Sequence, residues 1–262
     1  MLNNESNLWD KKYITSRRYN SEEDVFQFSK NNPTVCAIEP YIKDGMSVLE
    51  IGSGTGELVL YLAKKYPNCR MQGLDFSTES VIRSKEIANR FNILVSFVQG
   101  DIQKMPFADE SFDIVFGDQV LGHIENPKVA LREIYRVIKK EGVIAFSTAN
   151  SLRPDGWYLS KILSHSHQGY KQKGSFPWTL KSKLKKAGFK PVCLYGEMLV
   201  LFRVFSIIKS FFKKNKIEDQ KVSNPVFLKH SESKSFLKKF YYFLDKIFPV
   251  WSKVTIGVIT RK

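Results

Sequence analysis

The chain has few cysteines and no long apolar run, and each lack excludes a class of protein. Its 262 residues include 3 cysteines, widely spaced and without a Cys-x-x-Cys pair, which excludes a disulfide-built secreted domain and predicts reduced thiols. The most apolar stretch, Met198 to Ile208, is interrupted by Arg203 and Ser206 and is too short to span a bilayer. The first residues have neither the basic start nor the apolar segment of a signal peptide. We therefore expect a cytoplasmic protein.

Acidic residues are scarce in the second half of the chain. Residues 151–262 contain 23 Lys and Arg but only 6 Asp and Glu, whereas residues 1–150 contain 18 and 20. The net charge of +15 therefore originates in the C-terminal part. A basic surface of this kind concentrates anionic partners such as phospholipid headgroups, nucleic acid or acidic small molecules. A lysine-rich face that is only solvated is the alternative.

Short apolar runs alternate with amphipathic helices from Ser47 onward. The predicted strands are Val48–Ile51, Met71–Leu74, Leu94–Val98, Asp113–Phe116, Val143–Ser147, Pro191–Tyr195 and Val254–Ile259. The helices predicted between them are Leu58–Lys65, Glu79–Asn89, Val129–Lys139 and Leu180–Ala187. This spacing predicts right-handed βαβ crossovers and a doubly wound, mainly parallel α/β sheet.

Two parts of the chain are not needed for such a sheet. The N-terminal part is predicted to form a helical cap, with helices at Glu22–Ser29 and Thr34–Ile42. Another part, between the last two strands, is a basic helical insertion. The predicted order is cap, core, insertion and last strand, at residues 1–45, 46–197, 198–253 and 254–262.

A glycine-rich loop, Gly52-Ser53-Gly54-Thr55-Gly56, follows the first predicted strand and opens a helix. Glycine lets the backbone turn tightly and approach a ligand without a Cβ clash, and free N–H groups at the helix start face that ligand. A dinucleotide loop would need Gly-x-Gly-x-x-Gly, but position 57 is Glu57. Glu50, just before the loop, would repel a pyrophosphate and suit a cationic ligand.

Two aspartates follow the next two predicted strands. Asp75 lies 19 residues beyond Gly56, where a carboxylate can accept both hydroxyls of a ribose. A helix N-cap is the alternative, although Ser77 fills that role better. Asp101 could accept from the exocyclic amine of adenine, or could cap its own loop. Together these residues describe a nucleoside without a phosphate and with a positive centre near the glycine loop.

Six motifs occur in a fixed order within residues 45–150. They are Glu50–Gly56, Leu74–Ser77, Gly100–Ile102, Ser111–Val115, Val120–Ile124 and Leu131–Lys139. In order and spacing they resemble the motifs of class I S-adenosylmethionine-dependent methyltransferases. The resemblance is closest to the small-molecule branch that includes the ubiquinone and menaquinone C-methyltransferases.

This resemblance implies a Rossmann-like, seven-stranded sheet with an antiparallel last strand, and S-adenosyl-L-methionine as the cofactor. It implies that Glu50 and the loop hold the methionine end, that Asp75 takes the ribose, and that Asp101 takes the adenine. The full implied cofactor-binding set is Glu50, Gly52, Ser53, Gly54, Gly56, Asp75, Phe76, Asp101, Ile102, Asp118 and Gln119, of which the last two line the pocket near the sulfonium.

Histidines are the remaining candidates for chemistry. His123 follows the fourth predicted strand on the substrate side, where it could act as a general base toward the methyl acceptor. A structural or substrate-orienting histidine is the alternative. His165 and His167 have no metal-ligand partners at suitable spacing, so we expect no metal site.

The insertion and two missing motifs narrow the acceptor. The stretch Gly117–Leu121 lacks the Asn/Asp-Pro-Pro-aromatic motif of base-amine methyltransferases, and no Pro-Cys nucleophile occurs, so nucleic-acid substrates are disfavoured. At helical spacing, Phe205 and Phe212 fall opposite Lys209 and Lys213, which is typical of an interfacial helix. A second helix, at residues 236–247, repeats the pattern. A lid over an apolar pocket is the alternative, and either element fits a hydrophobic substrate.

The sequence therefore predicts methyl transfer to a small, apolar or lipid-linked acceptor: a quinone precursor, a lipid or a lipid-carried glycan intermediate. The expected partner beyond this substrate is an anionic membrane surface, with the protein peripheral on its inner face. An RNA methyltransferase that uses the basic half, or a binding protein that has lost catalysis, remains open. The acceptor atom and the oligomeric state do not follow from the sequence.

Overall fold

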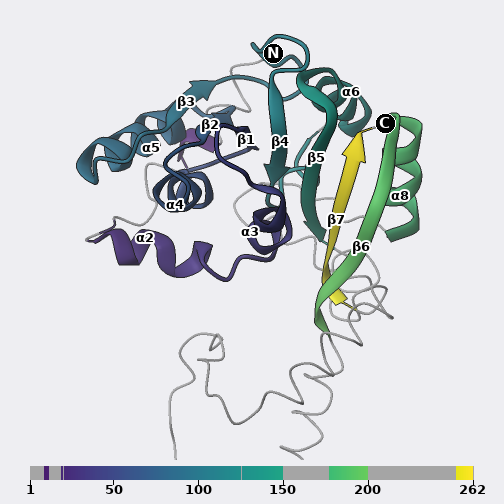
Figure 1. Cartoon of the computed structure of the whole chain (residues 1–262), viewed down its shortest axis with the longest axis horizontal. Coiled ribbons are helices and arrows are strands. Elements are labelled where there is room, and N and C mark those ends of the chain that lie inside the picture. The colour runs from purple at the N-terminus through teal and green to yellow at the C-terminus, as the bar shows by residue number, and fades with distance from the viewer. Residues whose placement is uncertain are drawn as a thin grey trace, which may run out of the picture.

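The computed structural model describes residues 9–11, 19, 21–124, 126–149, 177–199 and 252–261. Seven strands of this part form one sheet (Figure 1). They are β1 (Ser47–Ile51), β2 (Arg70–Asp75), β3 (Ser96–Gln99), β4 (Phe112–Gly117), β5 (Ile138–Ala149), β6 (Phe189–Leu199) and β7 (Ser252–Arg261).

The strand order across the sheet is β3-β2-β1-β4-β5-β7-β6. Strands β1 to β5 pair in parallel, and β7 runs antiparallel between β5 and β6. The predicted doubly wound, mainly parallel α/β sheet with a Rossmann-like order is confirmed. From β1 the sheet is extended on one side by β2 and β3, and on the other side by β4 and the later strands. The strand order therefore reverses at β1.

Helices cover both faces of the sheet. They are α2 (Glu22–Ser29), α3 (Pro33–Ile38), the 3-10 helix η1 (Glu39–Tyr41), α4 (Glu57–Lys65), α5 (Thr78–Arg90), α6 (Pro127–Val137) and α8 (Pro177–Lys186). Successive strand residues face opposite layers. Val48 and Ile114 therefore pack in one core cluster with α2 to α5. Leu49 and Val115 pack in a second cluster with α6 and α8.

Side-chain caps fix where two of the helices begin. Ser21 caps α2 in a reciprocal capping box with Asp24, and the helix has the predicted bounds. The Ser77 hydroxyl caps α5 by accepting the Ser80 N–H at 3.1 Å. These caps satisfy N–H groups that have no partner inside the helix. The expectation that Ser77 is the cap is confirmed.

The single helix predicted over Thr34–Ile42 is wrong in its second half. α3 ends at Ile38, and the 3-10 helix η1 follows. Pro40 lies in η1. Proline has no N–H to donate, and its ring clashes with the carbonyl four residues earlier in an α-helix. The α-helix therefore cannot continue through this position.

The strand predicted over Leu94–Val98 begins two residues later, at Ser96. Asn92 has a left-handed backbone with φ 51°, and the Ile93 N–H donates back to the Ala88 carbonyl at 2.9 Å. This is the way a helix commonly ends, so these residues still belong to the end of α5. Leu94 is 91% exposed and lies outside the sheet.

The helix predicted over Val129–Lys139 ends two residues early, at Val137. Ile138 already belongs to β5 because it pairs with Phe112 at the start of β4. The Ser111 N–H also donates to the Val137 carbonyl at 2.7 Å. Ile138 is fully buried, so its apolar side chain fits the pattern of either element and the sequence alone does not separate them.

The predicted insertion falls between β6 and β7. Leu199 in β6 pairs directly with Ser252 in β7. The first two and the last two residues of the predicted insertion, 198–253, therefore belong to these strands. The predictions for residues 200–251, with both amphipathic helices, lie outside the described residues, as do His165 and His167. Among the helices that the structure describes, none combines the length and apolarity needed to cross a bilayer.

Candidate active site

The predicted site residues gather at one edge of the sheet. The strand order reverses between β1 and β4, and in open α/β sheets ligands bind in the crevice beyond the carboxyl ends of the strands at such a point. The segments that follow β1 to β4 all start at this edge. They hold residues 52–56, 76–77, 100–105 and 118–124.

The glycine loop after β1 has a backbone that only glycine adopts without strain. Gly52, Gly54 and Gly56 have φ of 63°, 55° and 82°, which is the left-handed region. A Cβ at Gly52 would lie 2.4 Å from a methyl carbon of Val120, and one at Gly56 would lie 2.6 Å from the ring of Phe97. Both conformation and space therefore require glycine here.

Glu50, at the end of β1, is the most buried acid of the site, with 3% exposure. One of its oxygens accepts the Val59 N–H from α4 at 3.0 Å. Burial raises the pKa of Glu50 well above its ordinary value, and the nearby carboxylates of Glu57, Asp118 and Asp75 raise the pKa further. Four acidic side chains thus surround the loop, and together they favour a positively charged ligand.

Asp75 closes β2 and is 8% exposed. One carboxylate oxygen accepts the Gly54 N–H at 2.7 Å, and the other accepts the Ser77 N–H at 2.9 Å. The side chain therefore braces both the glycine loop and the start of α5. A carboxylate has about four acceptor positions, so one side chain can hold both elements at once.

Asp101 follows β3 and caps its own loop, as one of the two interpretations of the sequence expected. Its Oδ1 accepts the Gln103 N–H at 2.8 Å, and the Gln103 side-chain amide lies 3.4 Å from each carboxylate oxygen. Ile102 is buried in the core beside α6. Phe76, which follows Asp75, is half-buried.

Asp118 and Gln119 follow β4 and are tied to two residues that sequence reasoning missed. The Asp118 carboxylate accepts hydrogen bonds from the hydroxyls of Thr34 in α3 and Ser147 in β5. The Gln119 N–H donates to the Ser147 oxygen at 2.9 Å. Gln119 has a φ of 56°, an unusual conformation for a residue other than glycine. These hydrogen bonds join α3, β5 and the segment after β4 at the edge of the sheet.

Two N-terminal residues contact the segments on both sides of β1. The Asp10 carboxylate accepts the Ser77 hydroxyl and, at 3.2 Å, the Glu79 N–H. The Trp9 ring meets the His123 ring edge-on, with 5.2 Å between centroids. Ser77 follows β2 and His123 follows β4, so residues 9 and 10 extend from one side of the glycine loop to the other.

A third N-terminal residue, Tyr19, contacts the end of the glycine loop. The Tyr19 hydroxyl donates to the Glu57 carboxylate, which also accepts the Thr55 hydroxyl at 2.6 Å. Sequence reasoning did not identify the contacts made by Trp9, Asp10, Tyr19, Thr34 or Ser147, because each joins positions far apart in the chain. The polar end of the fifth strand, Ser147-Thr148, was the one local signal that could have found one of them.

Among the described residues, two buried hydroxyls have no hydrogen-bond partner, those of Ser53 and Thr148. Buried polar groups are nearly always paired, so the Ser53 hydroxyl inside the glycine loop is available to a ligand. Within the same described ranges, no cluster of three His, Cys, Asp or Glu side chains is arranged to hold a metal ion.

Known proteins match this chain by sequence. A family model described as a methyltransferase domain matches residues 42–198. Cycloartenol-C-24-methyltransferase 1 of Oryza sativa is 30% identical over 133 residues, which are 50% of this chain and 38% of that protein. A demethylmenaquinone methyltransferase of Lactobacillus johnsonii is 29% identical over 174 residues, or 58% of this chain and 71% of that one. The chain thus spans well under half the length of the plant relative.

Solved structures share the fold at low identity. Phosphoethanolamine N-methyltransferase 2 of Haemonchus contortus, in complex with S-adenosyl-L-methionine, superposes with a TM-score of 0.59 and 17% identity, over 96% of this chain and 60% of that one. The [4+2]-cyclase SpnF superposes with a TM-score of 0.58 and 17% identity, over 87% and 79%. Fold likeness of this kind does not fix the reaction. The sequence match over more than half of the chain, joined to the motifs and the sheet, shows that the protein belongs to the class I S-adenosylmethionine-dependent methyltransferase family.

Proposed function

We propose that the protein transfers a methyl group from S-adenosylmethionine to a small, apolar or lipid-linked acceptor. The observation that carries this proposal is the group of four carboxylates, those of Glu50, Glu57, Asp75 and Asp118, around a loop that only glycine can form. The names of relatives support the acceptor class, since they include sterol 24-C-methyltransferases and demethylmenaquinone methyltransferases. A quinone precursor, a lipid or a lipid-carried glycan intermediate fits this class.

The residues of the crevice fit this cofactor. Its sulfonium and amino groups are positive, which suits the acidic surroundings of Glu50. The Ser53 hydroxyl is buried without a partner, and the left-handed glycines of the loop allow the backbone to approach a ligand closely. Glu50 and the loop would hold the methionine end, Asp75 with Phe76 the ribose, and Asp101 with Ile102 the adenine.

The acceptor side of the crevice lies beyond β4. When bound, the cofactor supplies an electrophilic methyl group on sulfur. Asp118 and Gln119, tied to Thr34 and Ser147, would line the pocket beside that methyl group. His123 is exposed and held against Trp9. Its imidazole would orient the acceptor or take the proton that the acceptor atom loses.

The basic C-terminal half supports a location on an anionic membrane surface. In the described part, α8 contributes exposed lysines at 181, 185 and 186. Lysines near an anionic surface each contribute on the order of 1 kcal/mol, and salt screens them. The protein should bind anionic liposomes at low salt and neutral ones weakly. Replacing Lys209, Lys213 and Lys214 with Glu should release it without changing cofactor affinity.

The same basic charge supports RNA as a second acceptor class, and one experiment compares the classes. Labelled S-adenosylmethionine is incubated with the protein and separate lipid, RNA and polar-metabolite fractions of a cell extract. We expect label in the lipid or apolar fraction. Label in RNA, with binding that weakens steeply with salt, would support the alternative. Calorimetry that detects NAD but not S-adenosylmethionine would overturn the cofactor, and cofactor binding without label in any fraction would favour a binding protein.

A further inference from the structure

A tight turn at the end of β3 presents Asp101 to the crevice edge. The Lys104 N–H donates to the Asp101 carbonyl at 2.9 Å, and the Gln103 N–H donates to the Asp101 carboxylate at 2.8 Å. At the start of the turn, the Gly100 N–H donates to the Asp75 carbonyl at 2.9 Å. The turn is therefore closed on itself and attached at one end to β2.

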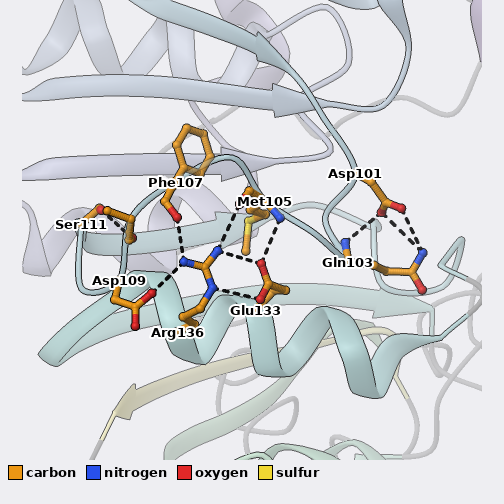
Figure 2. Close-up of polar contacts among 9 residues, drawn as sticks. Asp101, Gln103, Met105, Phe107, Asp109, Ser111, Glu133 and Arg136 are labelled. Carbon is orange, nitrogen blue, oxygen red and sulfur yellow. Dashed lines mark hydrogen bonds and ion pairs between the residues drawn. The ribbon is translucent and has the colours of Figure 1, made fainter.

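The other end of the turn, Met105, is held by two side chains of α6. The Met105 N–H donates to a Glu133 carboxylate oxygen at 3.0 Å, and an Arg136 nitrogen donates to the Met105 carbonyl at 3.1 Å. Figure 2 shows both side chains reaching from α6 to this residue. Both backbone groups of Met105 are thus bound to one pair of side chains, which we call the Glu133–Arg136 clamp.

Arg136 uses all of its donors at this point. Two of its N–H groups donate to Glu133, at 2.9 and 2.8 Å. Two others donate to the Phe107 carbonyl at 2.7 Å and the Asp109 carboxylate at 2.8 Å (Figure 2). The fifth binds Met105, and a guanidinium has five donors in a fixed fork. The hydrogen bond from Arg136 lowers the pKa of Glu133, so the pair stays charged at neutral pH.

These contacts serve the loop more than the helix. Support for α6 alone would need no more than the pairing of Arg136 with Glu133 three residues earlier. The remaining partners of the clamp are all in residues 105–109, directly after the turn that carries Asp101. Displacing Met105 would move one of the two anchors of this turn, and the other anchor, at Gly100, would act as a hinge.

We propose that the Glu133–Arg136 clamp is a positioning unit for adenine recognition. It fixes the place of the Asp101 carboxylate and thereby sets how well the site distinguishes a 6-aminopurine from a 6-oxopurine. This inference rests on the proposed contact of Asp101 with the exocyclic amine of adenine. An amine donates to the carboxylate, whereas a 6-oxo group turns a second acceptor toward it, so discrimination between the two bases reports the position of Asp101.

The test compares two ligands, S-adenosylhomocysteine and S-inosylhomocysteine, by calorimetry in the full chain. The wild-type protein should bind the adenine form about 100-fold more tightly, as sites built for a donor reject an acceptor. Arg136→Lys offers three donors in place of five. It should weaken binding of the adenine form about tenfold while changing the inosine form little. Arg136→Gln should reduce the discrimination further, and KM for the cofactor should rise more than kcat falls.

Matched controls separate positioning from fold stability. Arg132 is exposed on the same helix, and Arg132→Lys should leave both affinities unchanged. Melting temperatures are measured for every variant, and binding is measured where each is fully folded. A lower melting temperature with an unchanged ratio of the two affinities would make the clamp purely structural and overturn the inference. Wild-type protein that binds both ligands equally would overturn the role of Asp101 while leaving the cofactor in place, and failure to bind either would overturn the cofactor itself.

Discussion

The two sides of the crevice are held in place by different physics. On the β1 side the backbone conformation of the glycine loop and the close approach of Val120 and Phe97 leave no space for a side chain. On the β3 side the turn is held by hydrogen bonds to the charged side chains of Glu133 and Arg136. A steric clash becomes severe within fractions of an ångström, whereas a charged hydrogen bond weakens gradually as its two atoms move apart. The first side should therefore fail abruptly on substitution, and the second should respond by degrees.

The largest effect should come from Gly52→Ala, which attacks the steric side. The new Cβ would lie 2.4 Å from Val120, and the φ of 63° would strain any side chain. Strain and overpacking together should lower the free energy of unfolding by about 4 kcal/mol and abolish binding of S-adenosylhomocysteine. Denaturant unfolding and calorimetry measure the two effects.

Gly45→Ala is the matched control for this change. Gly45 also has a positive φ, 81°, but nothing lies within 4 Å of an added Cβ. It should lose only the strain, about 1 kcal/mol, and keep full cofactor affinity. In the double variant Gly52→Ala, Val120→Ala part of the stability should return. Equal losses at Gly45 and Gly52 would contradict a steric account.

The next effect in size is expected at Asp75, which touches both sides. Its carboxylate accepts the Gly54 N–H, and its carbonyl accepts the Gly100 N–H. Asp75→Ala should weaken cofactor binding by about 1.5–3 kcal/mol, because charge-assisted hydrogen bonds to the ribose are lost. Asp75→Asn keeps one acceptor and should lose less. Calorimetry that finds no change in either variant would remove Asp75 from the site.

Glu50→Gln should have opposite effects on stability and binding. Because burial and neighbouring carboxylates raise the pKa of Glu50, the folded protein holds this proton more tightly than the unfolded chain. Stability is therefore lost as pH rises from the ordinary pKa of a glutamate through the raised one. The glutamine variant avoids this loss, so it should be more stable by about 1 kcal/mol at neutral pH, with a smaller gain near pH 4.

The same Glu50 variant should bind S-adenosylmethionine, which is positive at sulfur, less tightly. Its affinity for the uncharged nucleoside fragments should change little, because they do not use the negative charge. Unfolding curves at two pH values and paired calorimetry measure both effects. Equal losses for charged and uncharged ligands would indicate general damage to the loop instead.

The smallest effect is expected from Asp10→Ala, at the contact between the N-terminal residues and the start of α5. The start of α5 would lose the carboxylate that accepts the Ser77 hydroxyl and the Glu79 N–H. A half-buried contact of this kind contributes about 0.5–1 kcal/mol. Cofactor affinity should fall by no more than this. A loss as large as that at Asp75 would make residue 10 part of the binding site.

Local patterns predicted the fold well because they depend on neighbours in the sequence. Alternating apolar runs located all seven strands, and Ser77 marked the start of its helix. The errors lie where one residue fits two elements. Ile138 satisfies a helix and a strand equally, and the apolar Leu94 extended a strand that the end of α5 excludes.

The candidate site was predicted where backbone motifs present it and missed where contacts are distant in the sequence. The loop glycines, Asp75 and Asp101 follow strand ends that a pattern can locate. The contact between Thr34 and Asp118 joins residues 84 positions apart, and nothing in either local sequence indicates it. Glu133 and Arg136 lie within the motif Leu131–Lys139, but their spacing suggests only a pair along the helix, not the loop that they hold.

The pairing of Leu199 with Ser252 has a consequence for how the protein can be altered. These cross-strand partners are the last and first described residues of β6 and β7, so residues 200–251 connect two points that a two-residue hairpin turn could join. Closing a chain of that length instead of a two-residue turn costs about 3 kcal/mol in loop entropy. β7 runs antiparallel to β5, with Val254 opposite Ala149 at the carboxyl end of β5, so residues 200–251 leave and rejoin the sheet at the same edge as the cofactor crevice. Replacing them with a short turn should keep the pairing of β6 with β7, while its effect on the crevice would be measured by calorimetry with S-adenosylhomocysteine.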